Sequence, residues 1–112
     1  MKYCTTVIAV PDMEKSLQFY KDLFHQDVLV DLGKNKTLTC GLALQQGLEY
    51  IAEFDSSTMK FCSNTMELYF ETEDFDGFMK LLDLIHRWKD FMNRRLFLGF
   101  REKYISLIWM DI

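Results

Sequence analysis

The fold is determined by residues 7–24, which read VIAVPDMEKSLQFYKDLF. An apolar, partly β-branched run ends at Pro11, because proline cannot continue a central strand. Asp12 follows where a helix N-cap is expected, and Glu14 adds negative charge to the first turn. Apolar residues then recur at helical spacing: Met13, Leu17, Phe19, Tyr20, Leu23 and Phe24. The stretch predicts a strand followed directly by a helix with one buried face.

A second copy of this pattern follows 62 positions later, with Asp74 in the place of Asp12 and Phe70 in the place of Ile8. Residues 69–85 read YFETEDFDGFMKLLDLI, and their predicted apolar stripe contains Phe75, Phe78, Leu82 and Ile85. This period is too long for a solenoid repeat and is about half the chain. The sequence therefore predicts two similar halves within one domain.

Length and composition exclude several classes of protein. The 112 residues suit one domain with its own core, and 49% hydrophobic with 27% charged residues is typical of globular proteins. We expect a cytoplasmic protein, since no signal peptide or membrane-length apolar run is visible. The net charge of −4 argues against a nucleic-acid partner. Cys4, Cys40 and Cys62 lack the spacing of a zinc or redox motif and are predicted to be buried free thiols.

Strands are expected at 3–10, 27–32, 37–45 with an interruption at Gly41, 66–72, 95–100 and 104–110, while 47–54 fits either a helix or a strand. Alternation places one set of strand residues beneath the helices: Ile8, Val10, Leu68 and Phe70. The opposite face then carries Tyr3, Thr5, Val7, Ala9, Glu67, Tyr69 and Glu71.

This order of elements resembles the vicinal oxygen chelate superfamily, which includes glyoxalase I, bleomycin resistance proteins and extradiol dioxygenases. The likeness is carried by IAVPDMEKSLQFYKDLF, CGLALQ and NTMELYFETEDFDGFMKLL, spans roughly residues 1–86, and is strongest to small glyoxalase-like members. It implies an α+β fold of two βαβββ modules, 1–56 and 61–112, forming a curled mixed sheet with helices on its outer face. A pocket inside would bind a small molecule through Thr5, Val7, Glu67, Tyr69 and Glu71.

Metal-dependent members place a ligand, usually His, near the start of the first strand of each half, and a Glu in the last strand. The resemblance puts Thr5 and Glu67 at the first two positions, and Asp111 is the nearest carboxylate to the last one. A catalytic metal needs about three protein ligands. We therefore expect a protein without metal or other cofactor, in which Glu67 is the one candidate metal ligand. A metal-dependent lyase or dioxygenase with non-standard ligands is the alternative.

Other chemistry has fewer candidates. Glu67 and Glu71 form a possible general acid–base pair, which would require a raised pKa, and two solvated carboxylates are the alternative. His25 and His86 suit the ends of helices, where the dipole favours positive charge. Aromatic side chains that could line a pocket or pack in the core are Tyr3, Tyr50 and Tyr69. No phosphate loop, serine nucleophile elbow or Cys–His pairing is visible.

The C-terminal part differs from the rest of the chain. Residues 1–86 hold 7 Lys/Arg and 14 Asp/Glu, whereas residues 87–112 hold 6 and 3. His86-Arg87 and Arg101-Glu102-Lys103 stand where the family commonly has His-Pro and an acidic Pro-Asp-Gly turn. The second module is thus atypical from about residue 87, through a shifted reading frame, a truncation or ordinary divergence.

An incomplete second module would leave an apolar face uncovered: Ile105, Leu107 and Trp109. We therefore expect a homodimer. Three functions follow from the sequence: metal-free binding of a small organic molecule, as in bleomycin resistance; metal-dependent catalysis; or a decayed site that leaves only a structural homodimer.

Overall fold

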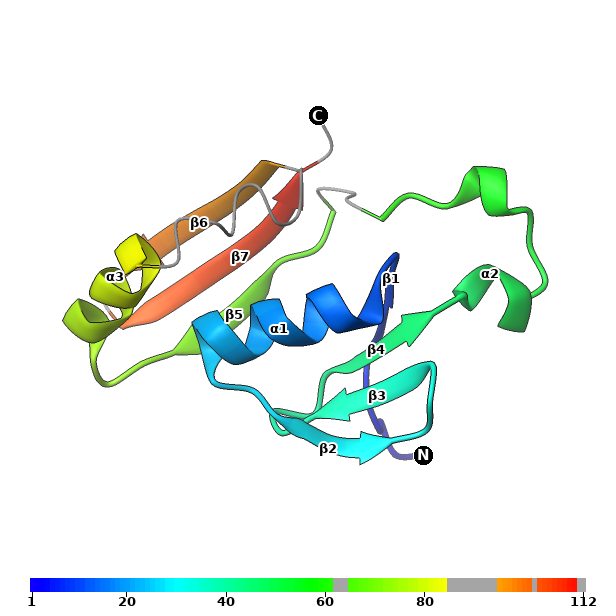
Figure 1. Cartoon of the computed structure of the whole chain (residues 1–112), viewed down its shortest axis with the longest axis horizontal. Coiled ribbons are helices and arrows are strands. Elements are labelled where there is room, and N and C mark those ends of the chain that lie inside the picture. The colour runs from blue at the N-terminus through cyan, green and yellow to red at the C-terminus, as the bar shows by residue number, and fades with distance from the viewer. Residues whose placement is uncertain (62–64, 85–94, 102, 111–112) are drawn as a thin grey trace. The chain divides into compact units, whose positions relative to one another are not determined.

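The computed structural model describes residues 1–61, 65–84, 95–101 and 103–110 (Figure 1). The chain forms two compact units, Met1–Phe61 and Cys62–Ile112. Several sequence expectations lie outside the described residues or side chains: those for Cys62, Ile85, His86, Leu107, Trp109 and Asp111.

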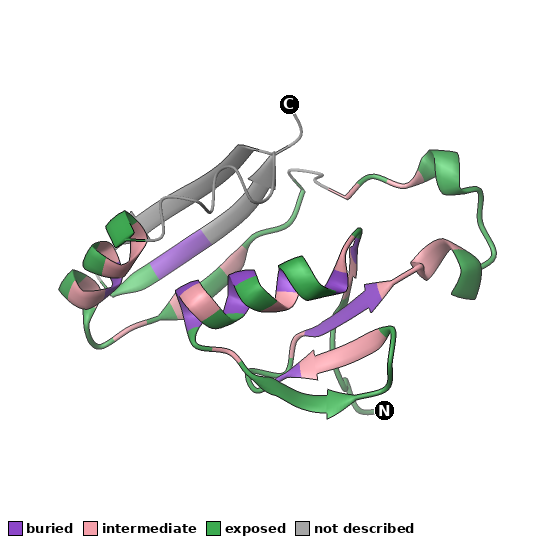
Figure 2. Ribbon diagram, in the orientation of Figure 1, coloured by how far each residue is buried: buried purple, intermediate pink, exposed green. Residues whose placement is uncertain are grey.

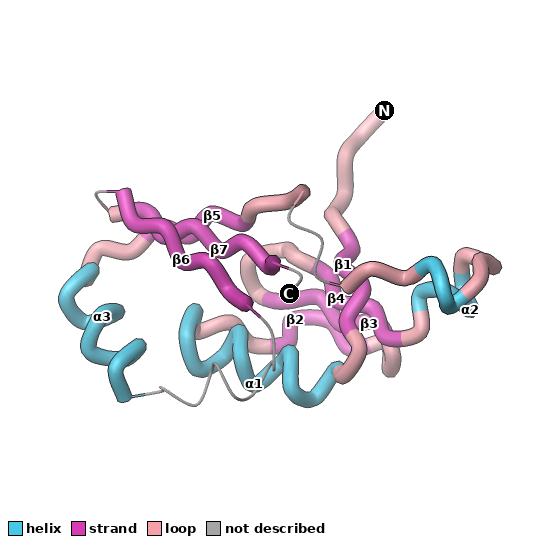
Figure 3. The backbone as a smooth tube through the Cα atoms, turned by 90° about the horizontal axis from the view of Figure 1, so that it is seen from above, coloured by secondary structure: helices cyan, strands magenta, loops and turns pink. Residues whose placement is uncertain are grey.

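The first unit has the βαβββ order that the sequence predicts. Its elements are β1 (Val7–Val10), α1 (Met13–Phe24), β2 (Val28–Asp31), β3 (Asn35–Leu38) and β4 (Ala43–Gln46). They form a sheet of order β1-β4-β3-β2, in which β1 and β4 are parallel and the other pairs antiparallel. Helix α1 lies along one side of this sheet (Figure 3). A short helix α2 (Leu48–Ile51) and a 3-10 turn η1 (Ser56–Thr58) follow.

Helix α1 begins and ends where the sequence predicts, after the N-cap Asp12 and before His25. The Asp12 carboxylate accepts a hydrogen bond from the Lys15 backbone N–H at 3.2 Å. The side-chain oxygen of Gln46, in β4, accepts from the Met13 N–H at 2.8 Å. His25 ends the helix in the left-handed conformation (φ 55°). The first turn of the helix is therefore capped both by its own sequence and by the sheet.

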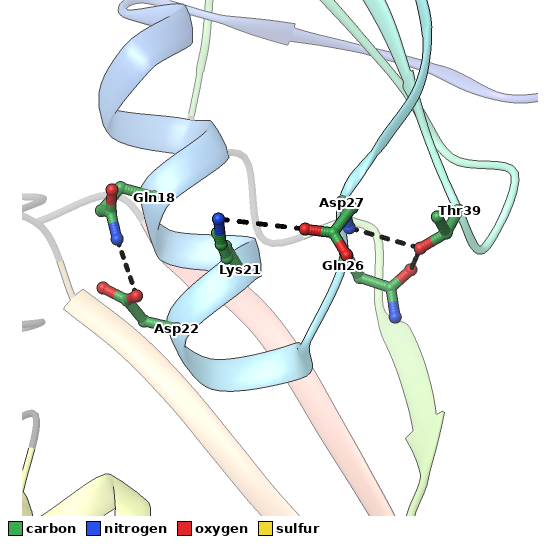
Figure 4. Close-up of polar contacts among 6 residues, drawn as sticks. All are labelled: Gln18, Lys21, Asp22, Gln26, Asp27 and Thr39. Atoms are coloured by element: carbon green, nitrogen blue, oxygen red, sulfur yellow. Dashed lines mark hydrogen bonds and ion pairs between the residues drawn. The ribbon is translucent and has the colours of Figure 1, made fainter.

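The segment that follows α1 is tied to the turn between β3 and β4 (Figure 4). The Gln26 side-chain oxygen accepts from the Thr39 hydroxyl at 2.8 Å and from the Cys40 backbone N–H at 2.8 Å. Asp27 N–H donates to the Thr39 hydroxyl at 3.3 Å. Lys21 of the helix lies 4.0 Å from the Asp27 carboxylate, an exposed and therefore weak ion pair.

The core of the first unit lies between α1 and the sheet (Figure 2). Leu38 and Leu44 are 0% exposed. The buried residues of α1 are Met13, Ser16, Phe19, Tyr20, Leu23 and Phe24, whereas Leu17 is half-buried. The buried face of the helix thus includes Ser16 and only part of Leu17, so it is turned slightly from the predicted stripe.

Strand β2 forms one edge of this sheet and is exposed along its whole length. Its register shifts between Val28 and Val30, which marks a β-bulge. Asp31 pairs with Lys36 of β3 at 2.7 Å. The Lys36 side chain and then the Gly33 N–H hold the pKa of the Asp31 carboxyl below its usual value.

The second unit begins like the first and then has one strand fewer in its described part. Its elements are β5 (Leu68–Glu71), α3 (Phe75–Leu84), β6 (Arg95–Arg101) and β7 (Tyr104–Met110). They form a sheet of order β5-β7-β6 with antiparallel pairs. Asp74 caps α3 by accepting from the Gly77 N–H at 2.8 Å, so the two helices begin 62 positions apart, at Met13 and Phe75.

Several expectations are corrected by the structure. Strand β1 begins at Val7 rather than residue 3, because its partner β4 begins only at Ala43, after the left-handed turn at Gly41 (φ 98°). β5 begins at Leu68 rather than residue 66, and the undecided segment 47–54 contains helix α2.

Two predictions about burial are wrong. Cys4 and Cys40 are exposed, because both lie outside the strands, in the segment before β1 and in the β3–β4 turn. Ile105 is 1% exposed within the single chain, so it is not the uncovered apolar residue that the dimer argument assumed. Among the helices of the described residues, none has both the length and the apolar character that crossing a membrane requires.

Candidate functional site

In the second sheet, the described side chains of β5 and β7 form an apolar face and a polar face. Tyr69 is opposite Ser106 and Glu71 is opposite Tyr104, and residues paired in this way share a face. Leu68 and Phe70 alternate with them and are half-buried, while Tyr69 and Glu71 are exposed. The predicted alternation in β5 is therefore confirmed by the structure.

Glu67 lies one residue before β5 and carries an oriented carboxylate. The hydroxyl of Ser106, which is only 7% exposed, donates a hydrogen bond to its Oε1. The hydroxyls of Ser106 and then Tyr69 lower the pKa of the Glu67 carboxyl, because they stabilise its charged form. Glu67 is therefore ionised at neutral pH.

This electrostatic setting does not suit general acid catalysis, which would require a raised pKa at Glu67. It suits recognition by charge instead. Among the described residues Glu67 makes no ion pair, since its partners are neutral hydroxyls. Its negative charge is thus left available to a hydrogen-bond donor or a cation.

Glu71, four residues further along the same strand, is in a different setting. The Lys103 ammonium lies 2.6 Å from its carboxylate, and this contact raises the pKa of Lys103. The same ammonium lies 5.9 Å from the centroid of the Tyr104 ring. The charge of Glu71 is therefore neutralised within the unit, and the two glutamates are not equivalent.

In the first unit, Thr5 and Val7 lie near the start of β1. The Thr5 hydroxyl donates to the backbone oxygen of Gly41 at 2.5 Å, so it is occupied by the β3–β4 turn. Val7 is 42% exposed. Thr5 therefore supports the local backbone, and Val7 offers an apolar surface.

A pair of amides lies on the same face of the first sheet as Val7, because Val7 pairs with Ala43 and Gln45 follows two positions later. Asn35 donates from its side-chain nitrogen to the Gln45 side-chain oxygen at 2.9 Å, and Gln45 is 5% exposed. This polar pair was not predicted from the sequence.

The structure brings Glu67 and Tyr69 together and adds two partners that sequence reasoning missed, Ser106 and Lys103. The alternation in 104–108 signals that Tyr104 and Ser106 share a face. That pattern does not show that Ser106 bonds to Glu67, which lies 39 positions earlier in the chain. Tyr3 and Tyr50 are largely exposed, at 75% and 78%. That Thr5 and Val7 line one hollow with Glu67 stays a prediction.

The donors that surround Glu67 bear on the question of a metal. The described partners are two hydroxyls, whereas a divalent catalytic ion takes about three protein ligands, mostly imidazole, thiolate or carboxylate. In the described ranges, no group of three or more His, Cys, Asp or Glu residues is arranged to hold a metal ion.

A βαβββ unit followed by a second strand and helix with the same capping pattern is the arrangement expected of vicinal oxygen chelate folds. The family described as "Glyoxalase-like domain" matches residues 3–93, which run through the first unit and into the second. The chain belongs to this family.

The fold is similar to a crystal structure of a protein of unknown function from Agrobacterium tumefaciens str. C58, with a TM-score of 0.69 and 24% sequence identity. The match covers 100% of this chain and 95% of that chain, and it concerns the fold alone. No functionally curated protein matches the sequence.

Proposed function

We propose that the protein binds a small organic molecule without a metal ion, against the polar face of β5 and β7. Glu67 would accept a hydrogen bond from the ligand, and the ring of Tyr69, whose residue is 63% exposed, would supply a flat apolar surface. The family resemblance also predicts ligand contacts at Glu71, Thr5 and Val7, and these stay predictions. The mode of action would be sequestration, by analogy with bleomycin resistance proteins.

The observation that carries this proposal is the state of Glu67. A carboxylate whose charged form is stabilised by two hydroxyls, and that makes no ion pair in the described part of the chain, is prepared for an external partner. Its lowered pKa favours binding over proton transfer. The arrangement matches a ligand that carries an amine or another strong donor next to an apolar ring.

A thermal-shift screen with a panel of small organic molecules tests the proposal. A ligand at about 100 times its Kd stabilises the folded protein by about 2.7 kcal/mol, which gives a clear rise in Tm. We expect Glu67→Gln to abolish the rise. Glu73→Gln is the matched control, because Glu73 is also an exposed glutamate but lies in the connection between β5 and α3. Equal rises in both variants would refute the role of Glu67.

Metal analysis of the purified protein separates this proposal from metal-dependent catalysis. Stoichiometric nickel, zinc, manganese or iron that is lost in Glu67→Gln but kept in Glu73→Gln would support a lyase or dioxygenase instead. A panel without any thermal shift, together with absent metal, would favour a decayed site.

We also propose that the chain forms a homodimer. Exposed apolar side chains gather on the edge strand β2 and just after it, which supports association there rather than through Ile105: Val28, Leu29, Val30 and Leu32. Light scattering at micromolar concentration should give twice the chain mass of 13.4 kDa. A monomer mass would refute the dimer. A cytoplasmic location stays a prediction.

A further inference from the structure

Strand β2 has an open side along which another strand can pair. In the sheet of the first unit it lies last in the order β1-β4-β3-β2, so β3 is its one neighbour among the described strands. The Leu32 N–H donates to the Asn35 backbone oxygen at 2.9 Å, and hydrogen-bonded and non-hydrogen-bonded pairs alternate along an antiparallel ladder. The N–H and C=O of Asp31, one position earlier, therefore face away from β3. Such an open row of backbone groups is a template for another strand.

The side chains of this edge are apolar on both faces of the sheet. Residues 28–30 are apolar in succession, and successive side chains of a strand point to opposite faces. All of β2 is exposed, and so is Leu32 directly after it. The two leucines of the stretch, Leu29 and Leu32, are exposed by 64% and 73%. The edge therefore offers apolar surface above and below its free backbone groups.

The edge has few of the features that prevent strands from pairing. Edge strands commonly avoid association through proline, lysine or an unbalanced charge, and residues 28–32 contain neither proline nor lysine. Their one charged residue is Asp31, whose carboxylate lies 2.7 Å from the Lys36 ammonium of the same sheet. Its charge is therefore balanced within the unit. The β-bulge between Val28 and Val30 adds twist, so the stretch that can pair is short.

A second copy of the chain is complementary to this edge. A two-fold axis brings β2 of one copy antiparallel to β2 of the other, and the same residues then meet from both sides. The greatest overlap of residues 28–32 with their copy places Val30 opposite Val30, Val28 opposite Leu32 and Leu29 opposite Asp31. Apolar side chains then meet at Val28, Val30 and Leu32. The two Asp31 carboxylates do not lie directly opposite each other, which would be destabilising.

We propose that two copies of the chain pair antiparallel through β2, with the two-fold axis at Val30, so that their first sheets join into one continuous sheet. This inference rests on the homodimer proposed above, and it adds the backbone pairing and the residue at the axis. It does not depend on the ligand proposed at Glu67, because it requires only the first unit.

Charge substitution at Val30 tests this arrangement, because the axis places residue 30 beside its own copy. Val30→Lys and Val30→Glu should each give the monomer mass of 13.4 kDa in light scattering, since like charges meet at the axis. An equimolar mixture of the two variants should recover twice this mass, because a lysine then faces a glutamate. This recovery also shows that both variants fold. The control Ile51→Lys, at an apolar position of α2 that is 65% exposed, should remain a dimer.

The outcomes distinguish this inference from the homodimer on which it rests. A monomer mass for the unaltered chain refutes both, and would leave the edge to a strand of another protein. A dimer that persists in both Val30 variants overturns the pairing through β2 and leaves the homodimer intact. The pairing is also overturned if the mixture stays monomeric while the circular dichroism of each variant matches that of the unaltered chain.

Discussion

Strand β1 meets its neighbour β4 in parallel, whereas β5 meets its neighbour β7 antiparallel. In both units the strand after the helix runs in the direction of the strand before it, as the pairings require. Each later hairpin reverses the chain, and the first unit has two hairpins where the described second unit has one. The sequence repeat of strand, cap and helix therefore does not determine the sheet. The number of hairpins after the helix does.

The units also differ in what they bury. The first encloses α1 against two fully buried strand leucines, Leu38 and Leu44. The described part of the second buries Phe78 and Ile105 and exposes a face with two glutamates, Glu67 and Glu71. Among the described residues, the first unit therefore supplies the core between a helix and a sheet, and the second supplies an exposed face that carries carboxylates.

The largest test of this comparison removes a core side chain from the first unit. Leu44→Ala should lower the free energy of unfolding by about 3 kcal/mol, because Leu44 is 0% exposed and its loss leaves a cavity. Ile51→Ala, at a position 65% exposed, should cost less than about 0.5 kcal/mol. Urea denaturation gives both values. Relative to the unaltered protein, Leu44→Ala should accelerate amide hydrogen exchange more in β1–β4 than in β5–β7. Equal acceleration in both sets of strands would show that the units unfold together.

A smaller effect tests the feature that the units share. Asp12→Ala and Asp74→Ala should each cost about 1 kcal/mol, since each removes a side-chain acceptor from the first turn of a helix. Asp12→Ser and Asp74→Ser keep an oxygen and should be close to neutral. Thermal or urea unfolding measures the losses. A loss confined to one unit would contradict the equivalence of the two caps.

Gly77 provides a sharper probe of the same caps. A Cβ at Gly77 would collide with Oδ2 of Asp74, whereas Lys15 has a Cβ at the matching position after Asp12. Gly77→Ala gains helix propensity of about 1 kcal/mol but displaces the cap, so we expect a net change within about 0.5 kcal/mol. In the Asp74→Ala background the same substitution should stabilise by about 1 kcal/mol. Equal effects in the two backgrounds would exclude the contact.

The smallest effects concern two carboxylates with lowered pKa values. Lys36 and Gly33 lower the pKa of Asp31, and neutral hydroxyls lower the pKa of Glu67. Each contributes stability that is present above the usual carboxyl pKa, about 4, and is lost as the pH falls through the lowered folded value.

Added salt should affect the pKa values of these two carboxylates differently. We expect added sodium chloride to raise the pKa of Asp31 toward its usual value, because its partner Lys36 is charged. The pKa of Glu67 should change less, because its partners are neutral hydroxyls. Carbon-detected NMR titration measures both. Lys36→Met should raise the pKa of Asp31 alone, and Ser106→Ala that of Glu67 alone. A salt response of the same size at both carboxylates would show that a cation also acts on Glu67.

Much of the fold was readable from the sequence because local signals agree with the tertiary structure. Three such signals depend only on residues close to them in the sequence: the caps at Asp12 and Asp74, the apolar spacing behind them and the break at Gly41. The length of β1 was not readable, since it depends on where the distant β4 begins. The exposure of Cys4 and Cys40 was missed for the same reason.

The candidate site was readable only in part. Alternation placed Tyr69 and Glu71 on an exposed face, which the structure confirms. The hydroxyl of Ser106 and the ammonium of Lys103 come from another strand and decide the charge state or pairing of each glutamate. Residue type and spacing in one strand do not specify such partners.

The hydrogen bond from the Met13 N–H to Gln46 has a consequence for the order of folding. It joins the first turn of α1 to the last strand of its unit, 33 positions later. A helix formed early would lack this acceptor until β4 docks, and isolated short helices are marginal in water. Completing the helix and completing the sheet are therefore coupled, and a fragment that stops before β4 should populate α1 only transiently.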